Sequence, residues 1–302
     1  MKALVTGTSG QLGFDVMEEL TRRGHIGVGA DRAETDANFP HVVLDITDAK
    51  RVMEVVRDIK PDVIIHCAAW TNVDAAELPE NLEVVRSVNV EGTRNLALAA
   101  KEVDAKFVYI STDYVFDGSG VEPWEPDDKN YAPINVYGQS KLDGEKVVSS
   151  ILDKYFIVRI AWVFGRNGKN FIKTMIEVGK KRSVVSVVDN QIGTPTYTVD
   201  LARLLVDMIE TDKYGYYHAT NEGGYISWAD FAEEIYKQAG MGTKVERMST
   251  NEYEKIAGRT VARRPFNSRL SKSKLLDNEF KPLPEWQDAL SRFLIESDII
   301  ES

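Results

Sequence analysis

The stretch TGTSGQLG at residues 6–13 stands directly after a short apolar run and directly before a helical pattern. Its glycines, Gly7, Gly10 and Gly13, have the spacing GxxGxxG. Glycines so placed allow a tight turn and a close approach of backbone to a pyrophosphate, and the following helix presents N–H groups to it. A tight turn that binds nothing could use the same residues. The position at the first turn between strand and helix favours a dinucleotide site.

Outward from this stretch, the first half of the chain alternates between apolar runs and helical patterns. Strands are expected at residues 2–7, 26–31, 42–45, 62–69, 106–111 and 155–161, with helices between them. The runs are apolar throughout, which is typical of parallel strands covered on both faces. The order therefore predicts an α/β fold with a doubly wound, Rossmann-like parallel sheet and right-handed crossovers.

Two helix boundaries can be predicted from single residues. The first helix should end near Arg23, because Gly24 suits the left-handed position after a helix. Thr47 is expected to be the N-cap of a helix that ends near Lys60, before a proline.

The alternation of strands and helices becomes less regular after about Trp162. Expected helices (169–182, 198–211, 227–239, 284–297) there mix with short strands (184–188, 214–219). We therefore expect residues 1–161 to form mainly an NAD(P)-binding domain and residues 162–302 a smaller substrate lobe. A segment at about 190–212 is expected to return to the first domain. Repeats, low-complexity linkers and charge blocks are absent from the sequence.

Composition excludes several classes of protein. The net charge of −10 disfavours a nucleic-acid partner. Without a run of 18 apolar residues, no membrane span or membrane partner is expected, and the glycines near the N-terminus argue against a signal peptide. The single cysteine, Cys67, favours a reducing, cytoplasmic location. The four scattered histidines give no zinc-ligand spacing, so no metal site is predicted.

The second expected strand ends in GADR, where Asp31 stands at the position that reads the ribose of a dinucleotide. A carboxylate there favours NAD, whereas the adjacent Arg32 could hold the 2′-phosphate of NADP. We expect NADPH, with NADH possible. Asp45 could close the adenine end of the site, or could be only a charge near the start of a helix. The expected cofactor-binding set is Gly7, Gly10, Gln11, Leu12, Gly13, Asp31, Arg32, Asp45, Ile46, Ala68, Ala69, Tyr137 and Lys141.

The candidate reaction centre combines the end of the fifth strand with the segment NVYGQSK at residues 135–141. Thr112 follows the strand, and Tyr137 and Lys141 are four residues apart, so they share one face of a helix. Alone, this pair could be a coincidence of an exposed helix. Beside a bound nicotinamide, a hydroxyl, a phenol and an ammonium would be suited to proton transfer.

These motifs resemble the extended short-chain dehydrogenase/reductase superfamily, which is marked by GxxGxxG, a Ser or Thr after the fifth strand, and YxxxK. The fuller set STDYVFDG, PINVYGQSKLDGE, RIAWVFG, NQIGTPT and ARRPFNSRL resembles the dTDP-4-dehydrorhamnose reductases within it. The resemblance implies NAD(P)H-dependent reduction of the C4 ketone of dTDP-4-dehydro-L-rhamnose, with Thr112, Tyr137 and Lys141 catalytic. Related 4,6-dehydratases carry Asp-Glu after the threonine, whereas here Asp113 is followed by Tyr114, which disfavours elimination.

The substrate would be a nucleotide sugar. The resemblance implies Thr71, Val73, Thr112, Tyr114 and Trp162 as lining for its sugar, and Arg263 and Arg264 could bind its diphosphate. Trp162 could equally be core, and the arginines a surface cluster. The alternatives are a related nucleotide-sugar reductase or epimerase, or a non-catalytic subunit resembling the β-subunit of methionine adenosyltransferase. A homodimer is possible by resemblance.

Overall fold

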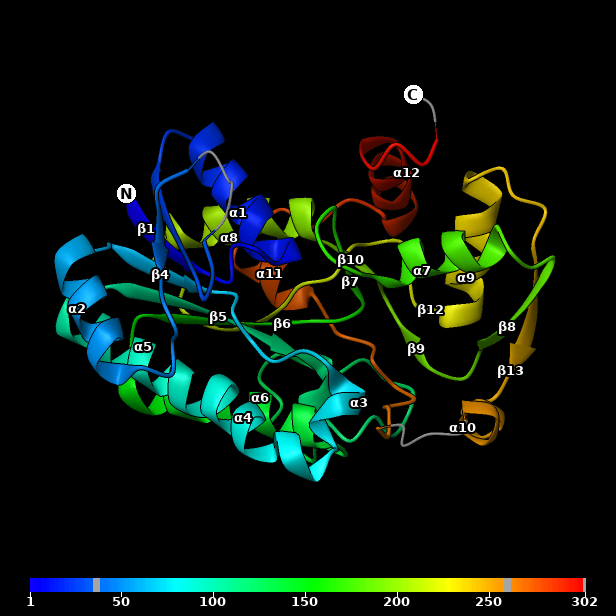
Figure 1. Ribbon diagram of the computed structural model, residues 1–302, viewed down its shortest axis with the longest axis horizontal. Helices are drawn as coiled ribbons and strands as arrows, with labels where there is room; N and C mark the ends of the chain where they lie inside the picture. The colour runs from blue at the N-terminus through cyan, green and yellow to red at the C-terminus, as the bar shows by residue number, and fades with distance from the viewer. Residues whose placement is uncertain (35–38, 258–261, 301–302) are drawn as a thin grey trace.

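The structure is a computed structural model that describes residues 1–34, 39–257 and 262–300. A seven-stranded parallel sheet, in the order β11-β6-β5-β4-β1-β2-β3, forms its centre (Figure 1). Its strands are β1 (Lys2–Thr6), β2 (Ile26–Asp31), β3 (His41–Val43), β4 (Val63–His66), β5 (Lys106–Thr112), β6 (Tyr155–Ile160) and β11 (Gly215–His218). The predicted doubly wound α/β fold is confirmed.

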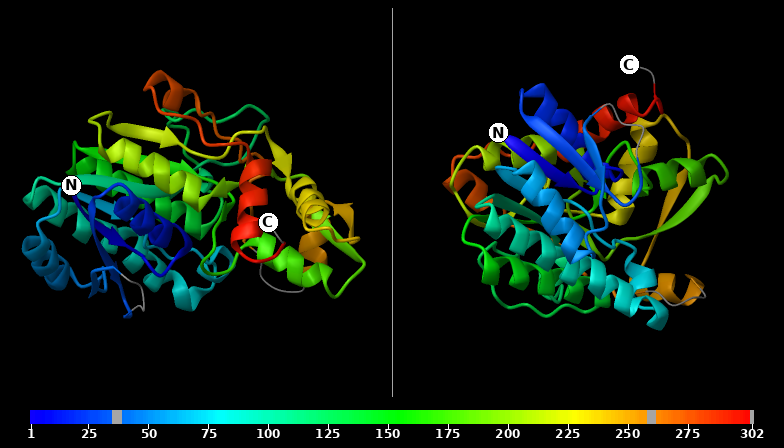
Figure 2. Two further views of the ribbon diagram at one scale, coloured as in Figure 1. Left: turned by 90° about the horizontal axis from the view of Figure 1, so that it is seen from above. Right: turned by 60° about the vertical axis from the view of Figure 1, so that its left-hand side comes forward.

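Helices cover both faces of this sheet, as the two views in Figure 2 show. One face packs on α1 (Gln11–Arg22) and α8 (Thr198–Ile209). The other face packs on α2 (Ala49–Ile59), α5 (Thr93–Glu102) and α6 (Val136–Ile151). Burial on both faces explains the continuous apolar runs, since neighbouring residues such as Ala3, Leu4 and Val5 are all fully buried.

Local sequence explains most helix ends. Gly24 follows α1 with a φ of +74°, as predicted for a residue after the helix. The N-cap of α2 is Asp48, which accepts a hydrogen bond from the Arg51 N–H, so the prediction of Thr47 is wrong by one residue. Thr47 instead donates its N–H and its hydroxyl to Asp45 Oδ1, which forms a turn before the helix.

The chain between β4 and β5 forms several consecutive helical segments. After α3 (Val73–Ala76) and a 3₁₀ turn, α4 (Leu82–Arg86) continues through a π-helical stretch, Ser87–Gly92, into α5. Asn89 in this stretch accepts a hydrogen bond from the Trp70 N–H and donates to Ser140 Oγ on α6. The π-helical stretch therefore ties the segment after β4 to the helix that carries Tyr137.

A second cluster of elements lies beyond the sheet, on the right in Figure 1. It contains β7 (Val163–Phe164), α7 (Phe171–Gly179), β8 (Val184–Val188), β9 (Ile192–Gly193), β10 (Thr196–Tyr197), β12 (Ile226–Ser227), α9 (Trp228–Gln238), β13 (Lys244–Met248), α10 (Thr250–Ala257) and α12 (Trp286–Glu296). A separate aromatic-rich core, which includes Phe164, Phe231 and Phe293, holds it together. The short α11 (Ser273–Asp277) packs near β11.

The chain passes between these two regions more than once. Helix α8 packs against α1, and β11 adds an edge strand beside β6. We retain as a proposal a boundary near residue 161, with residues 190–212 returning to the first domain.

Candidate active site

A cavity of about 800 Å³ opens at the carboxyl edge of the sheet. Its wall runs from the turn after β1, past the ends of β2, β4 and β5, to residues of the second region such as Lys169 and Trp228. Ligands in open parallel sheets bind at this edge. Of the predicted site residues, the cavity is lined by Gly7, Gly10, Gln11, Leu12, Gly13, Asp31, Arg32, Asp45, Ile46, Ala68, Ala69, Thr71, Val73, Thr112, Tyr114, Tyr137, Lys141 and Trp162.

The glycine turn has the shape that a pyrophosphate needs. Gly7 has a φ of +75°, and a Cβ there would lie 2.7 Å from the Ala68 nitrogen. A Cβ on Gly10 would meet only Gly7 O within 4 Å, at 3.1 Å, so this face is open. Gly10 is the N-cap of α1 without a capping side chain, which leaves the first-turn N–H groups for a ligand. The residues present therefore fit a dinucleotide.

Asp31 and Arg32, the two residues predicted to contact the ribose of the cofactor or its 2′-phosphate, lie at the end of β2. Asp31 accepts hydrogen bonds from the N–H groups of Ser9 (3.0 Å) and Arg32 (2.8 Å), so its carboxylate fixes the glycine turn. The Arg32 side chain belongs to an exposed residue on the cavity wall. Asp45 is held by Thr47, whose backbone N–H chiefly lowers the pKa of that carboxyl. A guanidinium at this end suits an added phosphate.

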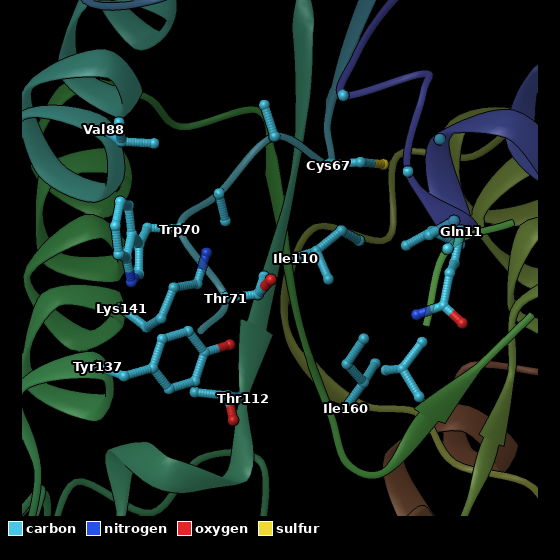
Figure 3. A pocket seen from close by; sticks show the side chains of 18 of the residues that line it. Gln11, Cys67, Trp70, Thr71, Val88, Ile110, Thr112, Tyr137, Lys141 and Ile160 are labelled. Carbon is cyan, nitrogen blue, oxygen red and sulfur yellow. The ribbon is translucent and has the colours of Figure 1, made fainter. Parts of the chain in front are cut away.

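Thr112, Tyr137 and Lys141 meet on one side of the cavity (Figure 3). Helix α6 starts at the N-cap Asn135, whose side chain accepts from the Gly138 N–H. A Cβ on Gly138 would lie 2.2 Å from the Tyr114 carbonyl oxygen, so only glycine lets α6 approach the turn after β5. This approach points the Tyr137 hydroxyl toward the side of the cavity where Thr112 lies.

Burial controls the charge of these groups. It lowers the pKa of Lys141 to about 7, and the Lys141 ammonium lies 4.1 Å from the centre of the Tyr109 ring. Burial raises the pKa of Tyr137 above its ordinary value. Desolvation is the largest cause, the charge of Asp113 adds to the rise, and a hydrogen bond with the Thr112 hydroxyl offsets part of it. A protonated phenol is the form that can donate a proton.

A buried polar network lies behind this side of the cavity. Glu145, one helical turn after Lys141, accepts hydrogen bonds from Ser111 Oγ (2.5 Å) and from the Arg159 guanidinium (2.8 Å). The Ser111 hydroxyl therefore binds Glu145, although Ser111 is also among the residues that line the cavity. The network connects β5, α6 and β6 directly beneath the reaction centre.

Several lining residues were not predicted. Lys169 lies in the segment GRNGKN, whose glycines and asparagines could have signalled a binding loop. Asn170 caps α7 and donates to Gln11 Oε1 (3.1 Å), which holds this loop against the glycine turn. Trp228 stacks on Trp162 with ring centres 3.7 Å apart, and no sequence pattern announced this pair.

The two predicted arginines do not line the cavity. Arg264 donates to Asp74 Oδ1 (2.8 Å) and to the Ala262 carbonyl oxygen (3.1 Å). Arg263 is exposed, and its carbonyl oxygen accepts from Asn135 Nδ2 (2.8 Å). Since Asp74 follows Val73, the Arg264 guanidinium is anchored next to a lining residue. A diphosphate role for the two arginines stays a prediction.

Searches for two other kinds of site concern only the described residues. Within ranges 1–34, 39–257 and 262–300, His, Cys, Asp and Glu side chains form no group of three or more that could hold a metal ion. Among the helices of those same ranges, none is long and apolar enough to cross a bilayer.

Comparison with known proteins agrees with this geometry. The family model described as RmlD substrate binding domain matches residues 1–299. The chain is 38% identical to the dTDP-4-dehydrorhamnose reductase of Aggregatibacter actinomycetemcomitans, covering 96% of this chain and 97% of that one. It is 35% identical to a dTDP-4-keto-6-deoxy-D-glucose reductase of Streptomyces niveus, covering 96% and 95%. A crystal structure of dTDP-4-dehydrorhamnose reductase from Bacillus anthracis in complex with NADP superimposes with a TM-score of 0.89, at 42% identity, covering 98% and 99%.

Proposed function

Because the chain belongs to the family of the RmlD substrate binding domain, we propose that it reduces dTDP-4-dehydro-L-rhamnose to dTDP-L-rhamnose with NADPH. The protein is an NADP-dependent oxidoreductase of dTDP-rhamnose synthesis. The observation that carries this function is one cavity that joins a dinucleotide cradle to Thr112, Tyr137 and Lys141.

The proposed chemistry assigns one task to each of these side chains. NADPH, when bound, supplies the hydride for C4 of the sugar. Tyr137 donates its phenolic proton to the oxygen of the carbonyl group as that oxygen gains charge, which is general acid catalysis worth about 100- to 10,000-fold. Thr112 donates a hydrogen bond to the same oxygen. Lys141 holds the cofactor's ribose and, as a cation below its pKa of about 7, stabilises the phenolate left on Tyr137.

The absence of an elimination base supports reduction over dehydration. Tyr114 occupies the position where related dehydratases carry glutamate, and its ring packs edge-on against Tyr137 with centres 5.9 Å apart. Burial raises the pKa of Tyr114 well above neutrality. A neutral phenol in this place cannot remove a proton from the sugar.

The sugar would lie between the reaction centre and the aromatic pair of Trp162 and Trp228. Thr71 and Val73 line the same cavity and are proposed sugar contacts. Trp162 has a φ of +51°, which is unusual for a bulky residue, and such conformations concentrate at ligand sites. Its indole stacks on Trp228 and also packs against the hydrophobic core of the second region.

The deciding experiment follows NADPH absorbance with purified protein and dTDP-4-dehydro-L-rhamnose, side by side with NADH. We expect oxidation that requires the sugar and is faster with NADPH. Tyr137→Phe should lower kcat by at least about 100-fold with little change in the KM for NADPH. Full turnover by Tyr137→Phe would contradict the assigned role.

Two other functions are tested by the same material. An epimerase would keep NAD through its cycle, so the purified protein would carry bound cofactor and give no net oxidation. A non-catalytic subunit would bind NADPH without turnover. A 4-keto-6-deoxy-D-glucose nucleotide is the comparison substrate, since a relative is named for its reduction.

The arginines are proposed to meet the substrate's diphosphate. Arg264 would have to share its guanidinium with Asp74, and Arg263 is exposed. The double variant Arg263→Ala and Arg264→Ala should raise the KM for the nucleotide sugar by about tenfold or more. An equal rise in the KM for NADPH would count against this role.

A cytoplasmic location and a homodimer remain proposals. The single cysteine, Cys67, is consistent with a reducing compartment, and burial raises the pKa of its thiol to about 12. Analytical ultracentrifugation at several protein concentrations would test the dimer.

A further inference from the structure

Asp113 is a buried carboxyl group on the wall of the catalytic cavity that the proposed mechanism does not use. Only 2% of the residue is exposed. Its Oδ1 lies 2.9 Å from Thr112 Oγ1. Its Oδ2 makes no hydrogen bond to any residue that the structure describes, although the nearby Ser268 hydroxyl lowers the pKa of the group. A buried carboxyl oxygen without a hydrogen bond is costly unless the group can become neutral.

The hydroxyl of Thr112 has a limited set of hydrogen bonds. It has one proton to donate and two lone pairs to accept with. One lone pair already accepts from the Tyr114 N–H at 3.2 Å. If Asp113 is ionised, the Thr112 proton must point to Oδ1, because a carboxylate can only accept. The hydroxyl then has no proton left for a ligand.

A protonated Asp113 reverses this arrangement. The carboxylic acid donates to Thr112 Oγ1, and both lone pairs of the hydroxyl are then filled. The only remaining capacity of Thr112 is its proton, which can turn into the cavity, where the Tyr137 oxygen is its hydrogen-bond partner until a ligand is bound. The Thr112 proton then points to the same side of the cavity as the Tyr137 hydroxyl (Figure 3).

We propose that Asp113 is a positioning residue which, in its protonated form, donates a hydrogen bond to Thr112 and so directs the Thr112 proton to the carbonyl oxygen of the substrate. The inference rests on the proposed function, since it specifies how Thr112 acts in that reduction. Asp113 itself does not exchange a proton with the sugar. Its carboxylic acid holds the same proton before and after each turnover.

The surroundings of Asp113 move its titration toward neutral pH. Burial raises the pKa of the carboxyl to about 6, so the neutral form predominates only below that pH, and hydrogen bonds from the Ser268 and Thr112 hydroxyls and from the backbone N–H groups of Asp113 and Tyr114 offset part of the rise. The titratable groups that face it are Tyr114 and Tyr137, and both are neutral phenols near pH 7 because burial raises their pKa. The charges of Arg264 and Asp74 act on Tyr114. Entry of two anionic ligands into the cavity disfavours a carboxylate further.

The test compares Asp113→Asn with Asp113→Ala in the NADPH-dependent reduction, from pH 5.5 to 8. Asparagine can donate to Thr112 Oγ1 at every pH, whereas alanine cannot. We expect Asp113→Ala to lower kcat by about 10- to 100-fold, and Asp113→Asn to lose much less. The kcat ratio of Asp113→Asn to wild type should rise at least about fivefold between pH 5.5 and 7.5, because only wild type loses the donor. Titration of Lys141 occurs in both proteins and cancels in the ratio.

A double variant separates positioning from a structural effect. In a Thr112→Val background, Asp113→Ala should cost less than about threefold further, because the hydroxyl it directs is gone. Thermal denaturation and NADPH affinity, measured for each variant, show whether the fold is kept. If Asp113→Ala does not fold, the Asp113→Asn ratio still decides.

Three results would overturn the inference. They are a pH-independent kcat ratio, a loss in Asp113→Asn as large as in Asp113→Ala, and losses that multiply in the double variant. If the wild type reduces the sugar and any of these results is found, only the role of Asp113 is rejected and the proposed function stands. Wild type that does not oxidise NADPH with the sugar rejects the proposed function and, with it, this inference.

Discussion

Arg159 on β6 and Glu145 on α6 form an ion pair that is wholly inside the protein, with side-chain exposures of 0% and 1%. Two parallel hydrogen bonds of 2.8 Å join the guanidinium to both carboxylate oxygens. The remaining donors of Arg159 reach the Pro126 carbonyl oxygen, the Tyr131 hydroxyl and the His218 ring nitrogen Nε2. Such a pair is stable only while every partner is present, because either charge alone is costly to bury.

Removal of one partner should therefore be strongly destabilising. Glu145→Gln leaves the Arg159 charge buried, and we expect a loss of about 3–5 kcal/mol in the free energy of unfolding. The matched control is Asp104→Asn, which breaks the exposed pair with Lys154 and should cost less than about 1 kcal/mol. Urea titration measures both. Equal losses in the free energy of unfolding for the two variants would mean that burial does not determine how much the Glu145–Arg159 pair contributes to stability.

Arg32 should decide the choice between cofactors. It lies on the cavity wall beside Asp31, whose oxygens already accept from two backbone N–H groups. Arg32→Ala should raise the KM for NADPH by about tenfold and change the KM for NADH by less than about twofold, since only NADPH carries the 2′-phosphate. Lys50→Ala, which removes an exposed cation at the start of α2, is the control for general charge effects. A parallel rise for both cofactors would assign Arg32 a structural role.

The sequence was sufficient to predict the sheet and the shared helix face of Tyr137 and Lys141, because both depend on local patterns. The order of apolar runs specified parallel strands covered on both faces, and the YxxxK spacing placed Tyr137 and Lys141 on one side of α6. Gly24 marked a helix end because only its local conformation mattered. Thr47 was mistaken for the N-cap because its hydroxyl donates to Asp45 instead, and Asp48 caps the helix. Residue preferences alone do not distinguish between such neighbouring candidates.

The rest of the site depends on contacts between distant segments. Arg159 stands in an apolar strand pattern, and nothing near it in sequence shows that Glu145 and Tyr131 converge on it. The stacking of Trp162 on Trp228 likewise joins two regions of the chain that no periodicity connects. The role of Asp113 needs the direction of a hydroxyl, which only a three-dimensional arrangement defines.

His66 should make stability depend on pH. Burial lowers its pKa to about 3, and the neutral ring bridges the hydroxyls of Thr6 (2.8 Å) and Thr93 (3.1 Å). The unfolded chain takes up a proton at a pKa near 6.5, so the contribution of His66 is present above that pH and is lost as pH falls toward 3. The expected slope is about 1.4 kcal/mol per pH unit.

The measurement compares the free energy of unfolding of wild type and His66→Gln at pH 7.5, 6.0 and 5.0. The difference between the two proteins should shrink as pH falls. This comparison isolates His66, because Asp15 and Asp113, whose pKa burial raises to about 6, change stability in the opposite direction in both proteins. A difference that is constant with pH would show that His66 accepts a proton in the folded state.

Alanine substitutions at Gly10 and Gly13 should have different effects, one on cofactor binding and the other on stability. A Cβ on Gly13 would lie 2.3 Å from Gly7 O, a backbone atom that cannot move aside, so Gly13→Ala should lower the free energy of unfolding by about 1–3 kcal/mol. A Cβ on Gly10 meets one atom at 3.1 Å and otherwise faces the cavity. Gly10→Ala should therefore fold with a thermal midpoint within a few degrees of wild type.

The methyl group of Gly10→Ala would stand where the pyrophosphate approaches the start of α1. We expect the Kd for NADPH to rise by about tenfold, which corresponds to about 1.4 kcal/mol. Fluorescence titration with NADPH and thermal denaturation of the same preparations give both quantities. Unchanged affinity for NADPH in a folded Gly10→Ala protein would mean that the dinucleotide does not contact this turn, because the added methyl group would otherwise collide with the pyrophosphate.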